Sequence, residues 1–503
     1  MTGSLIEAFV EAAETAPYAS LTVASEANPC RAKLSDVVSA GRRMGTRMMA
    51  AGVQPADVVG VMLPNWREWL VAAVACAQAG AVLLPIVTIY GAKELRFILR
   101  QSHAVWLFTP EHWRGVDYAA MVQGCGGLPE LQRHVMLGAE FDALEADGEI
   151  APFVRRNTDD LAVLVYTSGT TADPKGVMHS GRTIMAELHS MQEMRGQIAQ
   201  EAVLSPWPPG HVAGVISMFR FLAQGTTLVL MDQWDAGQAA MLVERHQITT
   251  SSGTPFHLSG MIDAADSAGR DLTCLQHYIV GAAPVPPSLV ERSKQLNLAV
   301  YHCYGSSEHP TVTSGKAEDP LDKQLNTEGR VIPGNELRFV DDDGDDVGDG
   351  EDGEIATRGP ELFIGYLDAT LNDAAFLPGG WYRTGDIGRL DADGYLLITD
   401  RKKDIIIRGG ENISSKEVEA VLLGHPAVAD VAVVAAPDDR MGEVVRACVV
   451  LKPGASLTLD DVRAFFASAG VARQKTPERL TVLEELPRNA SGKVLKHVLR
   501  WVG

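Results

Sequence analysis

Residues 161–176 read LAVLVYTSGTTADPKG, an apolar run followed by a loop dense in hydroxyl groups and glycine. The run 161–166 has the length and composition of a buried strand. Glycine lets backbone N–H groups approach a polyphosphate closely, hydroxyls donate further hydrogen bonds, and lysine neutralises negative charge. The stretch therefore predicts a strand followed by a polyphosphate-binding loop, whose candidate ligands are Thr167, Ser168, Gly169, Thr170, Thr171 and Lys175.

This loop is not a Walker A loop. That motif requires Gly-Lys-Ser/Thr, whereas the order here is Pro174-Lys175-Gly176.

Helical and strand-like patterns alternate on both sides of the loop over about the first 300 residues. Residues 35–52 predict an amphipathic helix with Ser35 as its N-cap and Gly52 at its end. Such alternation indicates an α/β fold in which helices cover a largely parallel sheet. Further strands are predicted at 57–64, 161–166, 226–231 and 277–281.

Residues 69–90, WLVAAVACAQAGAVLLPIVTIY, contain no charge and approach the length of a transmembrane helix. Gly80 and Pro85 interrupt the run. We therefore predict a buried helix followed by a short buried strand, and no transmembrane segment.

Residues 337–358 change character, with two strand-like runs around an acidic turn. Asp341, Asp343 and Asp345 suggest a calcium-binding loop, but Asp346 stands where that loop needs glycine and Asp352 where it needs glutamate. A solvated hairpin turn built on Asp-Gly is the favoured interpretation.

A smaller unit of strands and helices follows a charged cluster at Asp400–Asp404. Within it, Ser414 or Ser415 is a predicted helix cap. We place a domain boundary near residue 400. The expected architecture is a large N-terminal domain, 1–400, and a small α+β C-terminal domain, 401–503.

Composition limits the functional classes. The chain has 503 residues and a formal net charge of -20, which argues against a nucleic-acid binder. Six scattered cysteines form no CxxC pair, which favours reduced thiols in a cytoplasmic protein. The acidic start, with Glu7, Glu11 and Glu14, is not that of a signal peptide. The oligomeric state is left open, a homodimer being one alternative.

Several further motifs follow the loop in a fixed order over almost the whole chain. With the loop, they resemble the AMP-forming adenylating superfamily of acyl-CoA synthetases, luciferases and peptide-synthetase adenylation domains. The motifs are GAAP at 281–284, YGSSE at 304–308, WYRTGD at 381–386, DRKKD at 400–404, GGEN at 409–412 and PRNASGK at 487–493.

The resemblance implies an N-terminal domain that holds ATP and the acyl group. In this family Glu308 would bind Mg²⁺, an ion that prefers oxygen ligands and keeps several waters. Asp386 would accept hydrogen bonds from the ribose hydroxyls, with Arg401 as a second contact. The adenine would lie between Tyr304 and the backbone of Gly281, Ala282 and Ala283, beside Gly305 and Ser307.

The resemblance also implies a second step in which coenzyme A attacks the acyl-adenylate. Lys493 would bridge the attacking carboxylate and the α-phosphate. The mobile C-terminal domain would rotate at Lys403, and Gly409 and Gly410 would leave room for the pantetheine arm.

The sequence departs from the family pattern at three places. Ala172-Asp173 replaces the glycine that usually follows the second threonine of the loop, and Ser307 replaces the usual threonine. In WPPGH, at 207–211, His211 is retained as a catalytic candidate, but Gly210 stands where a bulky aromatic is common. We expect a more open acyl entrance there.

The acyl pocket implied by the resemblance is mostly apolar, with Met218 and Phe256 among its residues. Its only Arg or Lys is Arg220. This composition favours an apolar acid of medium-chain, alicyclic or aryl type. The pocket segments are 212–221, 253–257, 281–283 and 304–309.

Three functions stay open at this point. The first is an ATP-dependent acyl-CoA ligase. The second is an acyl-AMP ligase that loads the phosphopantetheine of a separate carrier protein, since no carrier-like segment follows residue 503. The third is a catalytically silent binding protein, which the candidate catalytic residues disfavour.

Overall fold

The computed structural model describes residues 4–167, 174–195, 198, 201–281, 287–409, 411–438, 440–469, 471–489 and 492–500. The chain forms two compact units. One comprises Met1–Glu336 and Arg358–Phe376, and the other Leu337–Thr357 and Leu377–Gly503. The predicted domain boundary near residue 400 stays a prediction.

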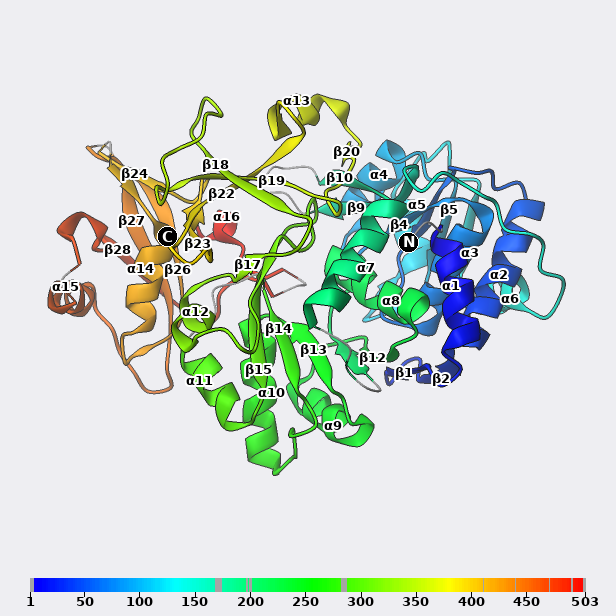
Figure 1. Cartoon of the computed structure of the whole chain (residues 1–503), viewed down its shortest axis with the longest axis horizontal. Coiled ribbons are helices and arrows are strands. Elements are labelled where there is room, and N and C mark those ends of the chain that lie inside the picture. The colour runs from blue at the N-terminus through cyan, green and yellow to red at the C-terminus, as the bar shows by residue number, and fades with distance from the viewer. Residues whose placement is uncertain are drawn as a thin grey trace. The chain divides into compact units, whose positions relative to one another are not determined.

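The first unit contains two large sheets (Figure 1). The nine-stranded sheet has the order β17-β16-β15-β14-β13-β11-β12-β1-β2. Its strands are β1 (Ser20–Ala24), β2 (Cys30–Lys33), β11 (Ala202–Ser205), β12 (Thr227–Met231), β13 (Thr250–Gly253), β14 (His277–Val280), β15 (Ala299–Tyr304), β16 (Thr313–Ser314) and β17 (Arg330–Val331).

The seven-stranded sheet has the order β20-β10-β9-β4-β3-β5-β8. Its centre is parallel, whereas β9 and β10 form an antiparallel hairpin. Its strands are β3 (Val58–Val61), β4 (Val82–Pro85), β5 (Trp106–Thr109), β8 (Arg133–Met136), β9 (Leu161–Thr167), β10 (Lys175–Ser180) and β20 (Gly365–Tyr366). The predicted strands and the largely parallel pairing are confirmed.

One hydrophobic core joins strands of both sheets with helices packed between them. Phe9, Trp69 and Phe219 are buried there, and the ring of Phe219 contacts the rings of the other two. These side chains come from α1 (Leu5–Thr15), α3 (Arg67–Ala79) and α8 (Val212–Gln224).

The uncharged run at 69–90 forms a helix and a strand, as predicted. Helix α3 stops at Gly80, whose left-handed φ of 66° caps the helix, and β4 follows. No helix in the described ranges is both long and apolar enough to cross a membrane.

The predicted helix at 35–52 is α2 (Leu34–Ala50), but its predicted cap is wrong. Lys33 is the N-cap, and Ser35 lies in the first turn. Leu34 is 1% exposed, so burial of this side chain places the helix start one residue ahead of the serine.

The second unit contains two smaller sheets. The first has β18 (Glu336–Val340), β19 (Gly353–Arg358), β21 (Phe376–Leu377), β22 (Trp381–Leu390) and β23 (Leu396–Arg401). The acidic turn after β18 is closed by backbone N–H groups of Asp343 and Asp345 that donate to Asp341 Oδ1, with Gly344 at φ 90°. The predicted Asp-Gly turn is confirmed.

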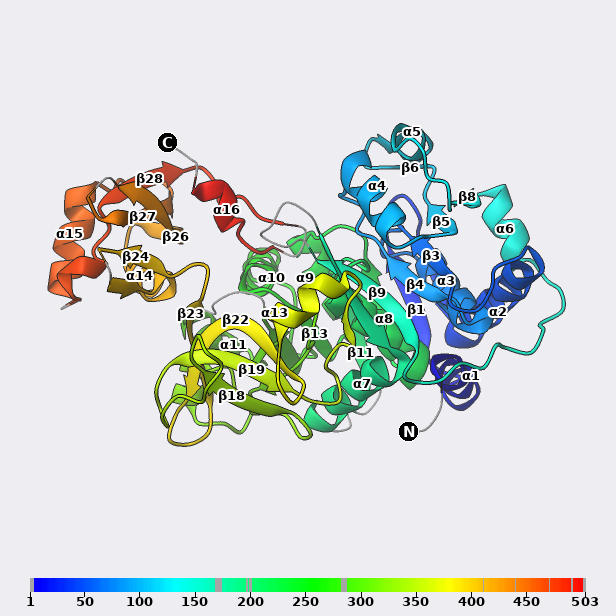
Figure 2. The same cartoon turned by 90° about the horizontal axis from the view of Figure 1, so that it is seen from above.

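The second small sheet has helices α14 (Ser415–Leu423) and α15 (Leu459–Ser468) on one face (Figure 2). Successive side chains of β26 point to opposite faces of this sheet. Val431 and Val433 pack on the face that the two helices cover, whereas Ala432 and Val434 pack on the other face with Leu499. Ser414 is the N-cap of α14, as one of the two predictions had it. The strands are β24 (Ile406–Arg408), β25 (Glu411–Ile413), β26 (Val428–Asp438), β27 (Gly442–Leu451) and β28 (Arg479–Leu483), and α16 (Lys496–Leu499) follows.

Candidate active site

The predicted polyphosphate loop joins β9 to β10. Thr167 ends β9 and Lys175 begins β10, and the two are register partners across the antiparallel hairpin. The hairpin thus brings the two ends of the loop side by side. Ser168, Gly169, Thr170, Thr171 and the unusual pair Ala172-Asp173 lie outside the described residues.

Gly281 and Tyr304 lie at the carboxyl ends of neighbouring parallel strands, β14 and β15. A Cβ on Gly281 would come within 3.1 Å of Cys303 Sγ, so glycine permits the close approach to β15. Tyr304 is 7% exposed. The structure therefore brings these two predicted residues together, whereas Ala282 and Ala283 lie outside the described residues.

A tight turn follows β15 and presents Glu308. The Ser306 N–H donates to the His309 carbonyl at 2.8 Å, and the Val312 N–H donates to the Tyr304 carbonyl at 2.8 Å. A Cβ on Gly305 would lie 1.9 Å from the Pro310 carbonyl oxygen, so only glycine fits this turn.

Strand β10 supports the same turn from the other large sheet. The Ser307 carbonyl contacts His179 Nε2 at 2.8 Å, and His179 Nδ1 contacts Thr183 Oγ1 at 3.1 Å. Burial lowers the pKa of His179 to about 4, so this imidazole is neutral and donates one hydrogen bond from its ring. The main chain of Ser307, rather than its side chain, carries this contact.

Tyr366, which the sequence interpretation missed, contacts two predicted residues. Its hydroxyl donates to Glu308 Oε1 at 2.7 Å, and Lys175 Nζ lies 5.2 Å from its ring centroid. The available signal was weak: Tyr366 is the one hydroxyl-bearing residue in the run LFIGYL at 362–367.

Two buried carboxyl side chains, those of Glu187 and Glu361, contact the residues that follow Glu308. Glu361 is fully buried, accepts a hydrogen bond from Ser190 and lies 3.7 Å from His309 Nε2. Thr311 Oγ1 donates to Glu187 at 2.7 Å. Because buried carboxylates are costly unless they are hydrogen-bonded, this network fixes the turn against helix α7 (Gly181–Arg195).

The segment WPPGH, at 207–211, packs differently from our expectation. A Cβ on Gly210 would lie 2.4 Å from the Val87 nitrogen and 2.6 Å from the Ile86 carbonyl carbon. The backbone after β4 therefore occupies the space that a side chain would take. The prediction of a more open entrance at Gly210 is wrong.

His211 is the N-cap of α8, and its Nδ1 accepts a hydrogen bond from the Ala213 N–H at 3.2 Å. Its ring stacks on Trp207, with centroids 5.7 Å apart. A role for His211 in helix capping is thus visible, and its catalytic role stays a prediction.

The other residues predicted near the acyl group differ in exposure. Met218 is buried in the main core, whereas Phe256 is 56% exposed. The Arg220 guanidinium is buried and pairs with Glu201 at 2.6 Å. This pairing neutralises the only Arg or Lys of the predicted acyl-pocket segments.

In the second unit, Asp386 and Arg401 lie opposite each other on β22 and β23. Arg401 Nε lies 2.9 Å from Asp386 Oδ1. Asp386 is 5% exposed, so the pair is largely shielded from water on the carboxylate side. The two residues predicted to contact ribose are therefore adjacent.

Lys493 is partly buried near the same pair. Burial, followed by the neighbouring Arg401 cation, lowers the pKa of Lys493 to about 7, although Asp386 opposes the shift. The loop that carries it is closed by the Lys493 N–H, which donates to Asn489 Oδ1 at 2.9 Å, and by the Asn489 N–H, which donates to the Lys493 carbonyl at 2.9 Å.

The predicted hinge residue, Lys403, is contacted from the segment that follows Lys493. Arg500 Nη2 donates to the Lys403 carbonyl at 2.6 Å and to Asp404 Oδ1 at 3.1 Å. These bonds fix the peptide between residues 403 and 404 to the C-terminal segment.

Gly409 begins the turn between β24 and β25, where its φ is 59°. A two-residue hairpin turn of this kind favours glycine for backbone reasons alone. Gly410 lies outside the described residues. The predicted pantetheine passage at these glycines stays a prediction.

The donor set around Glu308 fits a hard divalent cation such as Mg²⁺. Tyr366 contacts one carboxylate oxygen, and the carboxylate has a second oxygen to offer as a ligand. Across the described residues, no group of three or more His, Cys, Asp or Glu side chains could hold a metal ion. Glu308 would therefore act with water and phosphate oxygens rather than within a protein cage.

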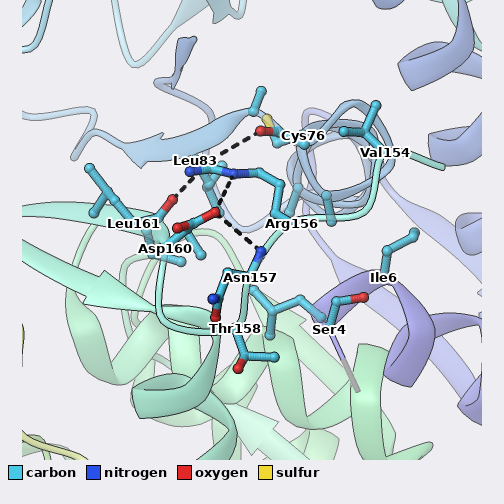
Figure 3. Close-up of a pocket in the computed structure, with 18 of the residues that line it drawn as sticks. Ser4, Ile6, Cys76, Leu83, Val154, Arg156, Asn157, Thr158, Asp160 and Leu161 are labelled. Carbon is cyan, nitrogen blue, oxygen red and sulfur yellow. Dashed lines mark hydrogen bonds and ion pairs between the residues drawn. The ribbon is translucent and has the colours of Figure 1, made fainter. Parts of the chain in front are cut away.

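A separate cavity of about 60 Å³ lies beside α1 and α3 (Figure 3). Arg156 lines it and donates to the carbonyls of Gly80 and Leu161, each at 3.2 Å. None of the predicted site residues lines this cavity.

Comparisons with known proteins identify the family of the chain. The family model described as AMP-binding enzyme matches residues 33–367, and that of the AMP-binding enzyme C-terminal domain matches residues 417–493. The medium-chain fatty-acid–CoA ligase of Escherichia coli (strain K12) is 36% identical over 470 residues, which cover 90% of this chain and 82% of that protein. The feruloyl-CoA synthase of an Amycolatopsis species is 32% identical over 460 residues, with 91% of each chain covered.

A solved structure is similar over nearly the whole length. The o-succinylbenzoate CoA synthetase of Bacillus subtilis, in complex with its acyl-adenylate intermediate, has a TM-score of 0.86 and 28% sequence identity. The match covers 99% of this chain and 98% of that one.

Proposed function

From the premise that the chain belongs to the AMP-binding enzyme family, we propose that it is an ATP-dependent, AMP-forming acyl-CoA ligase. In the first step a carboxylate attacks the α-phosphate of ATP, which gives an acyl-adenylate and pyrophosphate. In the second step the thiol of coenzyme A attacks the acyl carbon and AMP leaves.

The observation that carries the proposal is the proximity of Lys493 to Asp386 and Arg401 within one unit. Two anions must meet in the first step, so a cation at the reacting groups is required. Lys493 would supply this cation, while Asp386, oriented by Arg401, would accept hydrogen bonds from the ribose hydroxyls.

Residues of the first unit would hold the rest of the nucleotide. Thr167 and Lys175 flank the loop that would bind the phosphates, and Tyr304 would cover the adenine. Glu308 would hold Mg²⁺, which supplies charge neutralisation at the phosphates when bound. Rotation at Lys403 would then exchange the adenylation arrangement for the one that admits coenzyme A.

We infer that the acid is apolar: medium-chain, alicyclic or aryl. Pairing of Arg220 with Glu201 leaves the predicted pocket without an unpaired Arg or Lys to recognise a second carboxylate. The names of two relatives support an apolar acid, since one names a medium-chain fatty acid and the other a feruloyl group. The six free cysteines suit a reducing compartment, which supports the proposed cytoplasmic location.

Incubation with ATP, Mg²⁺ and a panel of apolar acids, with and without coenzyme A, tests the proposal. We expect AMP and acyl-CoA to form in equal amounts, with turnover that depends on coenzyme A. AMP release that never depends on coenzyme A, together with acyl transfer to a phosphopantetheinylated carrier protein, would instead support the carrier-loading alternative. A Lys493→Ala variant serves as the inactive control.

A further inference from the structure

Tyr366 stands between the two large sheets of the first unit. It belongs to β20, at the edge of the seven-stranded sheet, and its hydroxyl reaches Glu308, in the turn after β15 of the nine-stranded sheet. The hydrogen bond to Glu308 Oε1 is 2.7 Å long and is buried. We propose that Tyr366 is a positioning residue that orients the Glu308 carboxylate for the divalent cation that accompanies ATP.

The backbone around Tyr366 is fixed from three sides. Strand β20 pairs with β10 through Val177 and Met178, next to Lys175. The Tyr366 N–H donates to Asn372 Oδ1 at 2.8 Å. The Phe363 N–H donates to the Glu308 carbonyl at 2.8 Å, so the main chain before Tyr366 is attached to the residue that its side chain contacts. The position of the Tyr366 side chain relative to the Glu308 carboxylate is therefore fixed by the backbone.

The ring of Tyr366 is also held. It is 4% exposed, and it meets Phe363 edge-on with centroids 4.9 Å apart. Lys175 Nζ lies over the ring at 5.2 Å, a distance at which an ammonium is attracted to an aromatic face. Tyr366 thus contacts Lys175 through its ring and the Glu308 carboxylate through its hydroxyl.

This arrangement has a chemical consequence for the carboxylate. A hydrogen bond to Oε1 fixes the rotation of the carboxylate and leaves Oε2 as the oxygen that can face a cation. Ligands of metal ions are commonly oriented by such outer hydrogen bonds, and their loss typically costs about 10- to 100-fold in metal affinity. The inference rests on the proposed function, because it assumes that Glu308 is the metal ligand.

The test measures ATP binding by isothermal titration calorimetry at a series of Mg²⁺ concentrations, without acid or coenzyme A. Tyr366→Phe keeps the ring below Lys175 and removes only the hydroxyl. We expect the Mg²⁺ concentration for half-maximal ATP affinity to rise about 10-fold, with affinity recovering at saturating Mg²⁺. Tyr118→Phe is the matched control, because it removes another tyrosine hydroxyl, bonded to the Thr88 carbonyl at 3.2 Å, and should leave the Mg²⁺ dependence unchanged.

A double-mutant cycle separates positioning from a general structural role. In a Glu308→Gln background, Tyr366→Phe should change the Mg²⁺ dependence less than about 2-fold, because the carboxylate it orients is gone. Equal effects in both backgrounds, or ATP affinity lowered at every Mg²⁺ concentration, would overturn the inference. If the wild-type protein forms no AMP with any acid, the proposed function is wrong. If the wild-type protein is active and Tyr366→Phe leaves its Mg²⁺ dependence unchanged, only the inference about Tyr366 is wrong.

Discussion

Asp386 and Arg401 are register partners on antiparallel strands, and the Arg401 Nε lies 2.9 Å from Asp386 Oδ1. The two lie 15 residues apart in sequence and face each other because β22 and β23 pair. The contact with Arg401 holds the buried carboxylate in one orientation, in which its oxygens can accept hydrogen bonds from two hydroxyl groups.

The first prediction concerns this carboxylate. Asp386→Asn should raise the KM for ATP about 10- to 100-fold, since a hydrogen bond to a charged group contributes about 1.5–3 kcal/mol. Steady-state kinetics with varied ATP measures the effect. Asp352→Asn is the control, because Asp352 pairs with Arg389 on the surface at 2.7 Å, and it should leave the KM unchanged. Equal KM values for Asp386→Asn and wild type would exclude the nucleotide role.

Lys493→Ala should abolish formation of the adenylate from acid and ATP, because no cation then bridges the two anions. Reaction of coenzyme A with preformed acyl-adenylate should survive, since that step needs no attack on a phosphate. The two half-reactions are measured separately, as pyrophosphate release and as acyl-CoA formation. Lys452→Ala removes an exposed lysine of the same unit and should change neither. Equal loss of both half-reactions would contradict the assigned role.

The pH dependence of adenylation follows from the lowered pKa of Lys493, about 7. The cationic form predominates below that pH and is lost above it, so kcat/KM for adenylation should fall as pH rises through about 7. Lys493→Arg keeps a cation throughout and should shift this fall to higher pH, whatever its effect on the maximal rate. If kcat/KM falls over the same pH range in both proteins, a group other than Lys493 causes the fall.

Lys403→Pro should leave the first half-reaction near wild type and block the second, because proline fixes φ at the proposed pivot. Lys403→Ala removes the side chain but leaves the torsions free, and it should support both half-reactions. Single-turnover assays of each half-reaction distinguish the two variants. Coenzyme A transfer at the normal rate in Lys403→Pro would show that the pivot lies elsewhere.

Gly210→Ala should destabilise the first unit by about 1–3 kcal/mol, as is usual when a well-packed site is overfilled. The added Cβ would lie 2.4 Å from the Val87 nitrogen, which is backbone and cannot turn aside. Thermal unfolding followed by circular dichroism should show a lower midpoint. Gly127→Ala is the control, because a Cβ there meets nothing within 4 Å. An unchanged midpoint for Gly210→Ala would mean that the segment readjusts freely.

The sequence by itself determined the class of fold and the family of the chain. Hydrophobic runs with period and length typical of strands and helices are local properties, so β3, β4, β9, β12 and β14 could be predicted from them. Short motifs with chemically distinctive residues placed Lys175, Glu308, Asp386, Arg401 and Lys493 in one proposed reaction.

Only the tertiary structure decided which groups meet. Tyr366 reaches Glu308 across 58 residues of sequence, and the backbone at Ile86–Val87 fills the space beside Gly210. Likewise, Leu34 rather than Ser35 sets the start of α2, because burial against the core outweighs a favourable cap. Such contacts depend on how separate elements pack, and no local pattern of residues encodes the distance between them.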